Sequence, residues 1–369
     1  VASGPTWACA LDASDDVSCW RSFYFTGGGT SPIRATAVEV PLTGITHISP
    51  SNFVTAGGRV YHISSTVIES GADGATDVLS LAAGGVCHRT TGGGVRCQGG
   101  DDQGQLGNGE PRTLSSGWVN VSGLASGVTT LVGSSNARGA LTSGGTVYRW
   151  GSREFGSSCC DGVAAPESII TGAQQLVEAY DVACARVSGS ASCWGRVNDP
   201  MNGVSYTTTP ITLTMPTGIT DLALRSGGGV AIVGGGAVVT WGNDGAGLLG
   251  NGPGSAAGVV TIPGLTATRV FGDPSGVTET VCALRTDNRL VCWGLNRQGE
   301  VGDGTSAPRE SPTLVTALPA GLTIQDVVLG NGGACALLAG GTARCWGHGD
   351  FGVPHAVRTT TPVAVLGLP

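Results

Sequence analysis

The cysteines are the residues of this chain whose spacing most clearly permits chemistry. Ten of the twelve fall into five pairs whose members stand nine or ten residues apart. The pairs are Cys9 with Cys19, Cys87 with Cys97, Cys184 with Cys193, Cys282 with Cys292, and Cys335 with Cys345. Cysteines that face each other on the two strands of a hairpin lie close enough for a disulfide. The spacing therefore predicts five hairpin disulfides and an oxidising compartment.

The same pairs are poorly suited to metal binding. A structural zinc ion takes four nitrogen or sulfur ligands, whereas each pair offers two, and the five histidines do not cluster beside the pairs. We therefore expect no metal site and no cofactor.

The remaining cysteines, Cys159 and Cys160, are adjacent. Their α-carbons are about 3.8 Å apart, which is below the usual disulfide span, so a vicinal bond between them is strained. A vicinal or locally paired disulfide that stiffens a loop, a redox-sensitive kink and a bridge to a second chain all stay open. Mass spectrometry of non-reduced peptides distinguishes these three alternatives.

Catalytic motifs are absent from the sequence. It contains no G-x-S-x-G elbow and no H-E-x-x-H pair, and a phosphate-binding loop is excluded because there is no lysine. The histidines, which could act as general bases, are scattered over distant segments: His47, His62, His88, His348 and His355. The sequence therefore predicts a protein that is not an enzyme.

A repeat that runs the length of the chain must position these residues. The clearest copies have a Cys-Ala strand, a short turn, and a strand that ends in Cys-Trp, whereas degenerate copies keep only the turn and the strand after it. Successive copies are 35 to 53 residues apart. The residue after the second cysteine position marks eight copies: Trp20, Ile63, Gln98, Trp150, Trp194, Trp241, Trp293 and Trp346. This period is typical of four-stranded propeller blades. The marker tryptophans are expected in the core between neighbouring blades.

The two ends of the chain predict a closed ring. Val1–Gly4 stands before Cys9 as Val327–Gly330 stands before Cys335, and 361–368 supplies one further strand. We expect the C-terminal strand to join the first blade, which leaves few exposed sheet edges. The prediction is all-β: a single closed β-propeller domain over 1–369.

A glycine-rich loop follows the marker residue in three copies, at 103–109, 245–252 and 296–304. With the Cys-Ala-Leu strand and the Trp-Gly pair, this loop resembles the regulator of chromosome condensation repeat family, over the whole chain. The resemblance implies a β-propeller, and familiar members have seven blades. Because eight copies are counted here, we expect seven or eight blades; the copy near Ile63 is the weakest.

Composition narrows the partners and the compartment. The formal net charge is −7 and all 19 basic residues are arginine, so the surface is a poor match for nucleic acid. No apolar run approaches the roughly eighteen residues of a membrane helix, so no membrane insertion is expected. The disulfides favour an extracellular location, secreted or at the cell surface, and the missing lysine points to a GC-rich bacterial genome. The chain begins at Val1 without a signal-peptide pattern.

The predicted function is a binding scaffold for a protein or a cell-surface macromolecule, without catalysis. Arg21, Phe23, Tyr24 and Phe25 form the predicted binding loop, because aromatic residues and arginine are enriched at protein interfaces. These aromatics could equally cap the central channel. Two alternatives stay open. One is an inhibitor of a secreted hydrolase such as a β-lactamase, which the resemblance implies because some secreted members of the family inhibit such enzymes. The other is a structural subunit of an extracellular layer or filament. The oligomeric state is left open.

Overall fold

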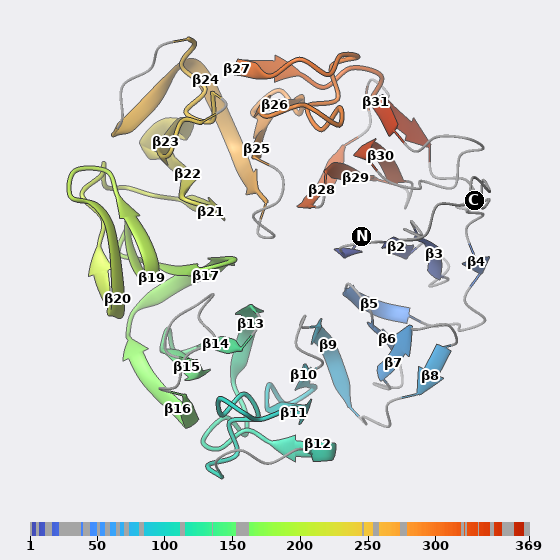
Figure 1. The fold of residues 1–369 in the computed structure, drawn as a ribbon, viewed down its shortest axis with the longest axis vertical. Helices are drawn as coiled ribbons and strands as arrows, with labels where there is room; N and C mark the ends of the chain where they lie inside the picture. The colour runs from blue at the N-terminus through green and yellow to red at the C-terminus, as the bar shows by residue number, and fades with distance from the viewer. Residues whose placement is uncertain are drawn as a thin grey trace, which may run out of the picture.

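The structure is a computed structural model, and Figure 1 shows it as a ribbon. It describes residues 2–4, 7–11, 17–21, 38–39, 45–49, 52–55, 60–63, 67–69, 74–80, 85–110, 115–134, 136–152, 162–245, 247–253, 258–273, 279–318, 321, 323–330, 332–339, 343–348 and 358–364. For the strands before residue 74, and for single strand residues elsewhere, only the backbone is described.

The described residues form antiparallel sheets, which lie around a common centre in Figure 1. The first sheet holds β1 (Ala2–Gly4), β2 (Trp7–Leu11), β3 (Val17–Arg21) and β4 (Val38–Glu39). The second holds β5 (Ile45–Ser49), β6 (Asn52–Thr55), β7 (Val60–Ile63) and β8 (Val67–Glu69). The third holds β9 (Ala75–Ser80), β10 (Val86–Thr90), β11 (Val95–Gly99) and β12 (Ser115–Asn120).

The chain repeats this order in the next two sheets. The fourth sheet holds β13 (Val128–Ser134), β14 (Ala137–Thr142), β15 (Val147–Gly151) and β16 (Val163–Ile170). The fifth holds β17 (Ala173–Ala179), β18 (Val182–Val187), β19 (Ser190–Asp199) and β20 (Gly203–Thr212). In each sheet the strand order follows the chain, from the innermost strand outward, as in a propeller blade.

A long strand joins the next two units into one seven-stranded sheet. Its strands are β21 (Asp221–Arg225), β22 (Gly228–Val233), β23 (Ala237–Gly242), β24 (Val259–Gly272), β25 (Thr280–Arg285), β26 (Leu290–Gly294) and β27 (Arg309–Leu314). The first half of β24 pairs with β23 and its second half pairs with β25. It is thus the outer strand of one four-stranded unit and the inner strand of the next. The last sheet holds β28 (Ile324–Gly330), β29 (Gly333–Leu338), β30 (Ala343–His348) and β31 (Arg358–Ala364).

Single strands and turns show three further features of the repeat. The weakest copy, which ends at Ile63, forms a four-stranded sheet of its own. Asn288, in the turn between two cysteine strands, has a φ of 61°, as expected for a tight hairpin turn. Pro312 lies on β27, the outermost strand of its unit, where its missing N–H removes no hydrogen bond to a further strand.

The prediction for the C-terminal strand is wrong over its described part. β31 pairs with β30, with Val363 opposite Cys345, and so completes the last sheet instead of the first. The physical reason lies in the repeat: Thr361–Val363 is equivalent to Ser311–Thr313, which forms an outer strand of its own unit. The first sheet draws all four of its strands from the N-terminal part of the chain, and its innermost strand β1 contacts β28.

The core lies between neighbouring sheets. One cluster joins Leu284 and Cys292 of one unit to Leu329 and Trp346 of the next, and all four side chains are buried. Among the described residues, one short 3-10 helix occurs, η1 (Gly234–Gly236). No helix in the described part of the chain is long and apolar enough to cross a membrane.

Candidate functional site: an apolar tip on a rigid ring

Three marker tryptophans connect their unit to the one before it through a hydrogen bond. The indole Nε1 of Trp150 donates a hydrogen bond to the carbonyl of Gln105, over 3.0 Å. Trp293 and Trp346 make the equivalent bonds to the carbonyls of Leu248 and Glu300, over 3.1 and 2.7 Å. The five marker tryptophans whose side chains are described are all buried: Trp150, Trp194, Trp241, Trp293 and Trp346. Their predicted place between blades is confirmed, and no carbohydrate-stacking ladder is formed by them.

The glycine-rich loops are shaped to receive these indoles. Asp101 Oδ1 accepts a hydrogen bond from the Leu106 N–H, over 2.8 Å, and so closes the first loop on itself. Asp244 and Asn296 close the other two loops in the same way. Gly250 has a φ of +72°, and a β-carbon there would lie 2.7 Å from Trp293 Nε1. The loop motif therefore has a structural role.

Four of the five predicted disulfides are present among the described side chains. They join Cys87 to Cys97, Cys184 to Cys193, Cys282 to Cys292, and Cys335 to Cys345. In each pair the two cysteines are directly opposite in the register of adjacent strands. The backbone also places Cys9 opposite Cys19, but these side chains lie outside the described residues. Cys159 and Cys160 lie outside them as well.

The predicted binding loop cannot be located in the structure. Arg21 is the last residue of β3, and its backbone is described, whereas Phe23, Tyr24 and Phe25 fall outside the described residues. Its role in binding stays a prediction.

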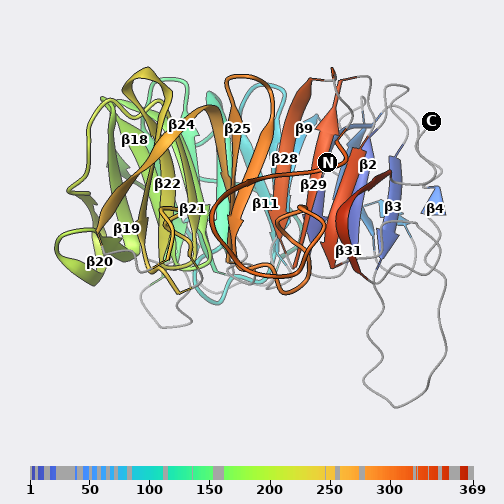
Figure 2. The same cartoon turned by 90° about the horizontal axis from the view of Figure 1, so that it is seen from above.

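A different apolar surface is visible on the fifth sheet. Four large hydrophobic side chains stand out as exposed among the described residues: Tyr180 at 52%, Met201 at 76%, Val204 at 53% and Tyr206 at 68%. Tyr180 lies in the turn between β17 and β18, and the other three lie in the β19–β20 hairpin. Because strands alternate in direction, these two turns lie at the same end of the sheet. Figure 2 shows the hairpin at that rim of the molecule. We call these four residues the apolar tip.

Contacts between the two turns make the apolar tip one surface. The Arg196 N–H donates to the carbonyl of Asp181, over 2.7 Å, and the Arg196 guanidinium lies 3.4 Å from the Asp181 carboxylate. Asp181 follows Tyr180 directly, and Arg196 is directly opposite Tyr206 in the hairpin register. The charged side chains of Arg196 and Asp181, which lie beside this surface, therefore form a pair with each other.

A buried carboxylate holds the end of the hairpin in place. Asp199 Oδ1 accepts hydrogen bonds from the N–H groups of Met201 and Asn202, and its Oδ2 accepts one from the N–H of Thr214. Burial by itself raises the pKa of Asp199, but these hydrogen bonds outweigh burial and lower the pKa below its usual value. Asp199 is therefore ionised at neutral pH. The exposed Met201 stands on a turn whose backbone is already ordered, which reduces the entropic cost of binding.

Sequence reasoning missed the apolar tip because the repeat pattern changes there. After Trp194 the glycine-rich loop is replaced by the hairpin, and Val197 of that hairpin packs against the next marker, Trp241. One sequence pattern does indicate this surface: Val204 and Tyr206 stand at alternate positions directly after the turn residues Asn202 and Gly203. Gly203 has a φ of +77°, which favours glycine at the end of a three-residue hairpin loop.

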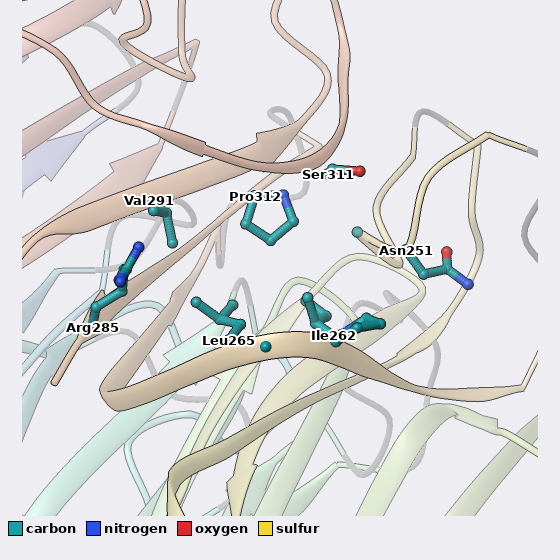
Figure 3. A pocket seen from close by; sticks show the side chains of 10 residues that line it. Asn251, Ile262, Leu265, Arg285, Val291, Ser311 and Pro312 are labelled. Carbon is teal, nitrogen blue, oxygen red and sulfur yellow. The ribbon is translucent and has the colours of Figure 1, made fainter.

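A hollow lies between β24 and β27, and Figure 3 shows its lining. Its volume is about 390 Å³. Ile262 and Leu265 lie below it and Pro312 above it, with Asn251 and Ser311 at one side. Arg285 also borders it, but its guanidinium is paired with Asp287 over 3.0 Å. The hollow has no cluster of polar groups that converge on one point, and the described residues contain no group of three or more metal-ligating side chains.

Comparisons with known sequences agree with this architecture. A family model described as the regulator of chromosome condensation (RCC1) repeat matches residues 287–337. Human E3 ubiquitin-protein ligase HERC2 is 31% identical over 137 residues, which is 33% of this chain, and the mouse protein matches equally. The chain spans only 3% of the length of these two relatives.

Comparisons with solved structures show the same fold. Yeast RCC1 (Prp20), crystallised bound to Kap60, aligns with a TM-score of 0.60 and 20% identity, over 79% of this chain and 75% of that chain. Human WBSCR16 aligns with a TM-score of 0.59 and 19% identity, over 89% of this chain and 84% of that chain. Residues 287–337 thus match the RCC1 repeat, and the chain is similar in fold to β-propellers built from such repeats.

Proposed function

We propose that this protein is an extracellular binding scaffold: one propeller domain over 1–369 that holds a partner protein at the apolar tip and acts without catalysis. The exposure of Tyr180, Met201, Val204 and Tyr206 on one ordered rim is the observation that carries the proposal. Tyrosine is enriched among residues that dominate binding energy, and methionine adapts to varied apolar partners.

The proposed scaffold is a closed ring of eight blades. The sheets supply eight four-stranded units among the described residues, if β24 is counted in both of its units. Contacts between β1 and β28 bring the first and last units together. Such a ring is rigid, so its rim loops can be held in fixed positions for a partner.

The disulfides support the extracellular location. Eight cysteines are joined in four buried bridges, and such bonds persist in oxidising surroundings. We propose a secreted or cell-surface protein of a bacterium, since arginine replaces lysine throughout the chain.

Binding by similar folds supports a protein partner. The yeast relative was crystallised with Kap60, and a second study of it concerns its binding to Gsp1p and histones. Those partners belong to that protein. Their relevance here is that the same fold serves protein recognition.

Capture from native culture medium tests the proposal. Wild-type protein is compared with Tyr206→Ser combined with Met201→Ser, and with Thr209→Ala as a control on the same strand but outside the apolar tip. We expect the double variant to lose the captured protein and the control to retain it. Unchanged capture by a folded double variant rejects the assignment of the site.

A further inference from the structure

The fifth sheet ends in an unusually long open edge. β20 is the last strand in its sheet order, and no described strand pairs with its outer side. It has ten residues, more than any other outer strand that belongs to a single unit, and Figure 1 shows it at the outer perimeter. In Figure 2, β20 lies at the left end of the molecule. Its backbone groups on the open side are therefore available for hydrogen bonds.

This edge lacks the charges that usually prevent strand pairing. β20 has the sequence GVSYTTTPIT, which contains no charged residue and is rich in β-branched and aromatic types. Several other outer strands carry charges, such as Glu167 in β16, Arg309 in β27 and Arg358 in β31. The outer strand β12 is also uncharged, but it has only six residues. Charges on edge strands normally prevent pairing with other chains. The uncharged edge thus favours the addition of a strand.

Local bonds limit the part of β20 that remains open. Both the N–H and the carbonyl of Thr209 bond the Thr207 hydroxyl. The Arg149 guanidinium donates to the carbonyl of Thr208, so this carbonyl is already occupied. Pro210, two residues further on, has no N–H to offer. The open stretch is therefore Gly203–Thr207, which pairs with β19 in an unbroken register from Asp199 to Gly195.

We propose that an extended segment of another protein adds to blade five as a fifth strand along Gly203–Thr207. This inference rests on the proposed function and specifies how the partner is held. Backbone hydrogen bonds supply affinity in this mode, and side-chain contacts supply specificity. The exposed Val204 and Tyr206 select a segment with apolar residues at alternate positions and no acidic groups. A second copy of this chain is disfavoured as the occupant, because each copy carries a net charge of −7.

A displayed library of 12-residue peptides is the probe. Peptides enriched on the oxidised, full-length protein are mapped by amide hydrogen exchange, and we expect slower exchange confined to 203–207. Proline is then placed at two adjacent positions, in the variants Val204→Pro and Ser205→Pro. Of the two N–H groups removed, one faces β19 and the other faces outward, so the variants test the two edges of the strand one at a time. The variant that keeps the unfolding temperature should lose peptide binding at least tenfold.

The outcomes separate this inference from the proposed function. Enriched peptides that need Tyr206 yet leave exchange at 203–207 unchanged overturn strand addition and leave the apolar tip as a binding site. Failure to enrich any peptide, or pairing of two copies through β20 detected by sedimentation, also overturns it. Enriched peptides that bind elsewhere and ignore Tyr206 overturn both.

Discussion

Trp293 donates its indole N–H to the carbonyl of Leu248, which lies in the glycine-rich loop of the preceding unit. The bond joins residues 45 positions apart, and both side chains are buried. The same bond recurs at Trp150 and Trp346. The family motif thus acts between blades: the loop of one unit completes the core of the next.

Trp293→Phe should destabilise the fold. It removes the indole N–H and leaves the buried carbonyl of Leu248 without its partner, which costs about 1–3 kcal/mol. Guanidinium unfolding of the oxidised protein measures the loss. Trp241→Phe is the matched control, because the described residues show no hydrogen bond from Trp241 to a loop carbonyl, and Val197 packs there instead. Equal losses in the two variants contradict a role for the hydrogen bond.

Gly250→Ala should cost more than Gly264→Ala. Both glycines have a φ near +70°, so alanine pays a similar backbone cost at each. At Gly250 the new β-carbon lies 2.7 Å from Trp293 Nε1, whereas at Gly264 nothing lies within 4 Å. The difference between their free energies of unfolding reports the close contacts at Gly250, with the indole and with Ile262 Cδ1 at 3.0 Å. We expect it to exceed about 1 kcal/mol, and a difference near zero means that the loop can move away without cost.

The sequence predicted the parts of the molecule that repeat. The spacing of Cys282 and Cys292 predicted a hairpin, because antiparallel neighbours are opposite each other across a short turn. Trp293 was predicted in the core because it has a fixed place in the motif, directly after Cys292 on a strand of the hairpin. Each of these follows from local geometry that every copy must satisfy.

Features that occur once were not predictable in the same way. The hairpin that carries Met201 and Tyr206 replaces the family loop in one unit, so no other copy indicates its form. The fate of Thr361–Ala364 was misassigned because a strand that follows the last marker can close either the last sheet or the first. Only pairing with β30 distinguishes these, and pairing between distant segments leaves little trace in a single sequence.

Removal of one disulfide should weaken the fold without changing it. Cys282→Ala combined with Cys292→Ala opens a loop with a separation of 10 residues, and should cost about 2–3 kcal/mol. Thermal unfolding with and without reductant measures the effect. In the wild type, reductant should lower the unfolding temperature further than the double substitution does, because it opens every bridge. If treatment of the denatured wild type with reductant leaves its unfolding temperature unchanged, the cysteines are not paired in solution.

The Glu178 carboxyl should make stability depend on pH. Burial raises the pKa of Glu178 to about 7, although a hydrogen bond from Gly133 and the charge of Arg138 act in the opposite direction. Arg138 is itself buried, and burial lowers its pKa to about 9, so it remains charged below neutral pH. The Oε2 atom of Glu178 is buried and has no hydrogen-bond partner among the described residues.

A carboxyl whose pKa is higher in the folded state than in the unfolded state binds its proton more tightly when folded. Its contribution is fully present below the usual glutamate pKa of 4.5 and is lost as the pH rises through about 7. Glu178→Gln keeps an acceptor for Gly133 and removes the titration. Between pH 4.5 and 7, the free energy of unfolding should therefore fall less in Glu178→Gln than in the wild type, by up to about 3 kcal/mol. Glu310→Gln on the surface is the control and should leave the fall unchanged. An unaltered slope in Glu178→Gln shows that this carboxyl reaches solvent in the folded ring.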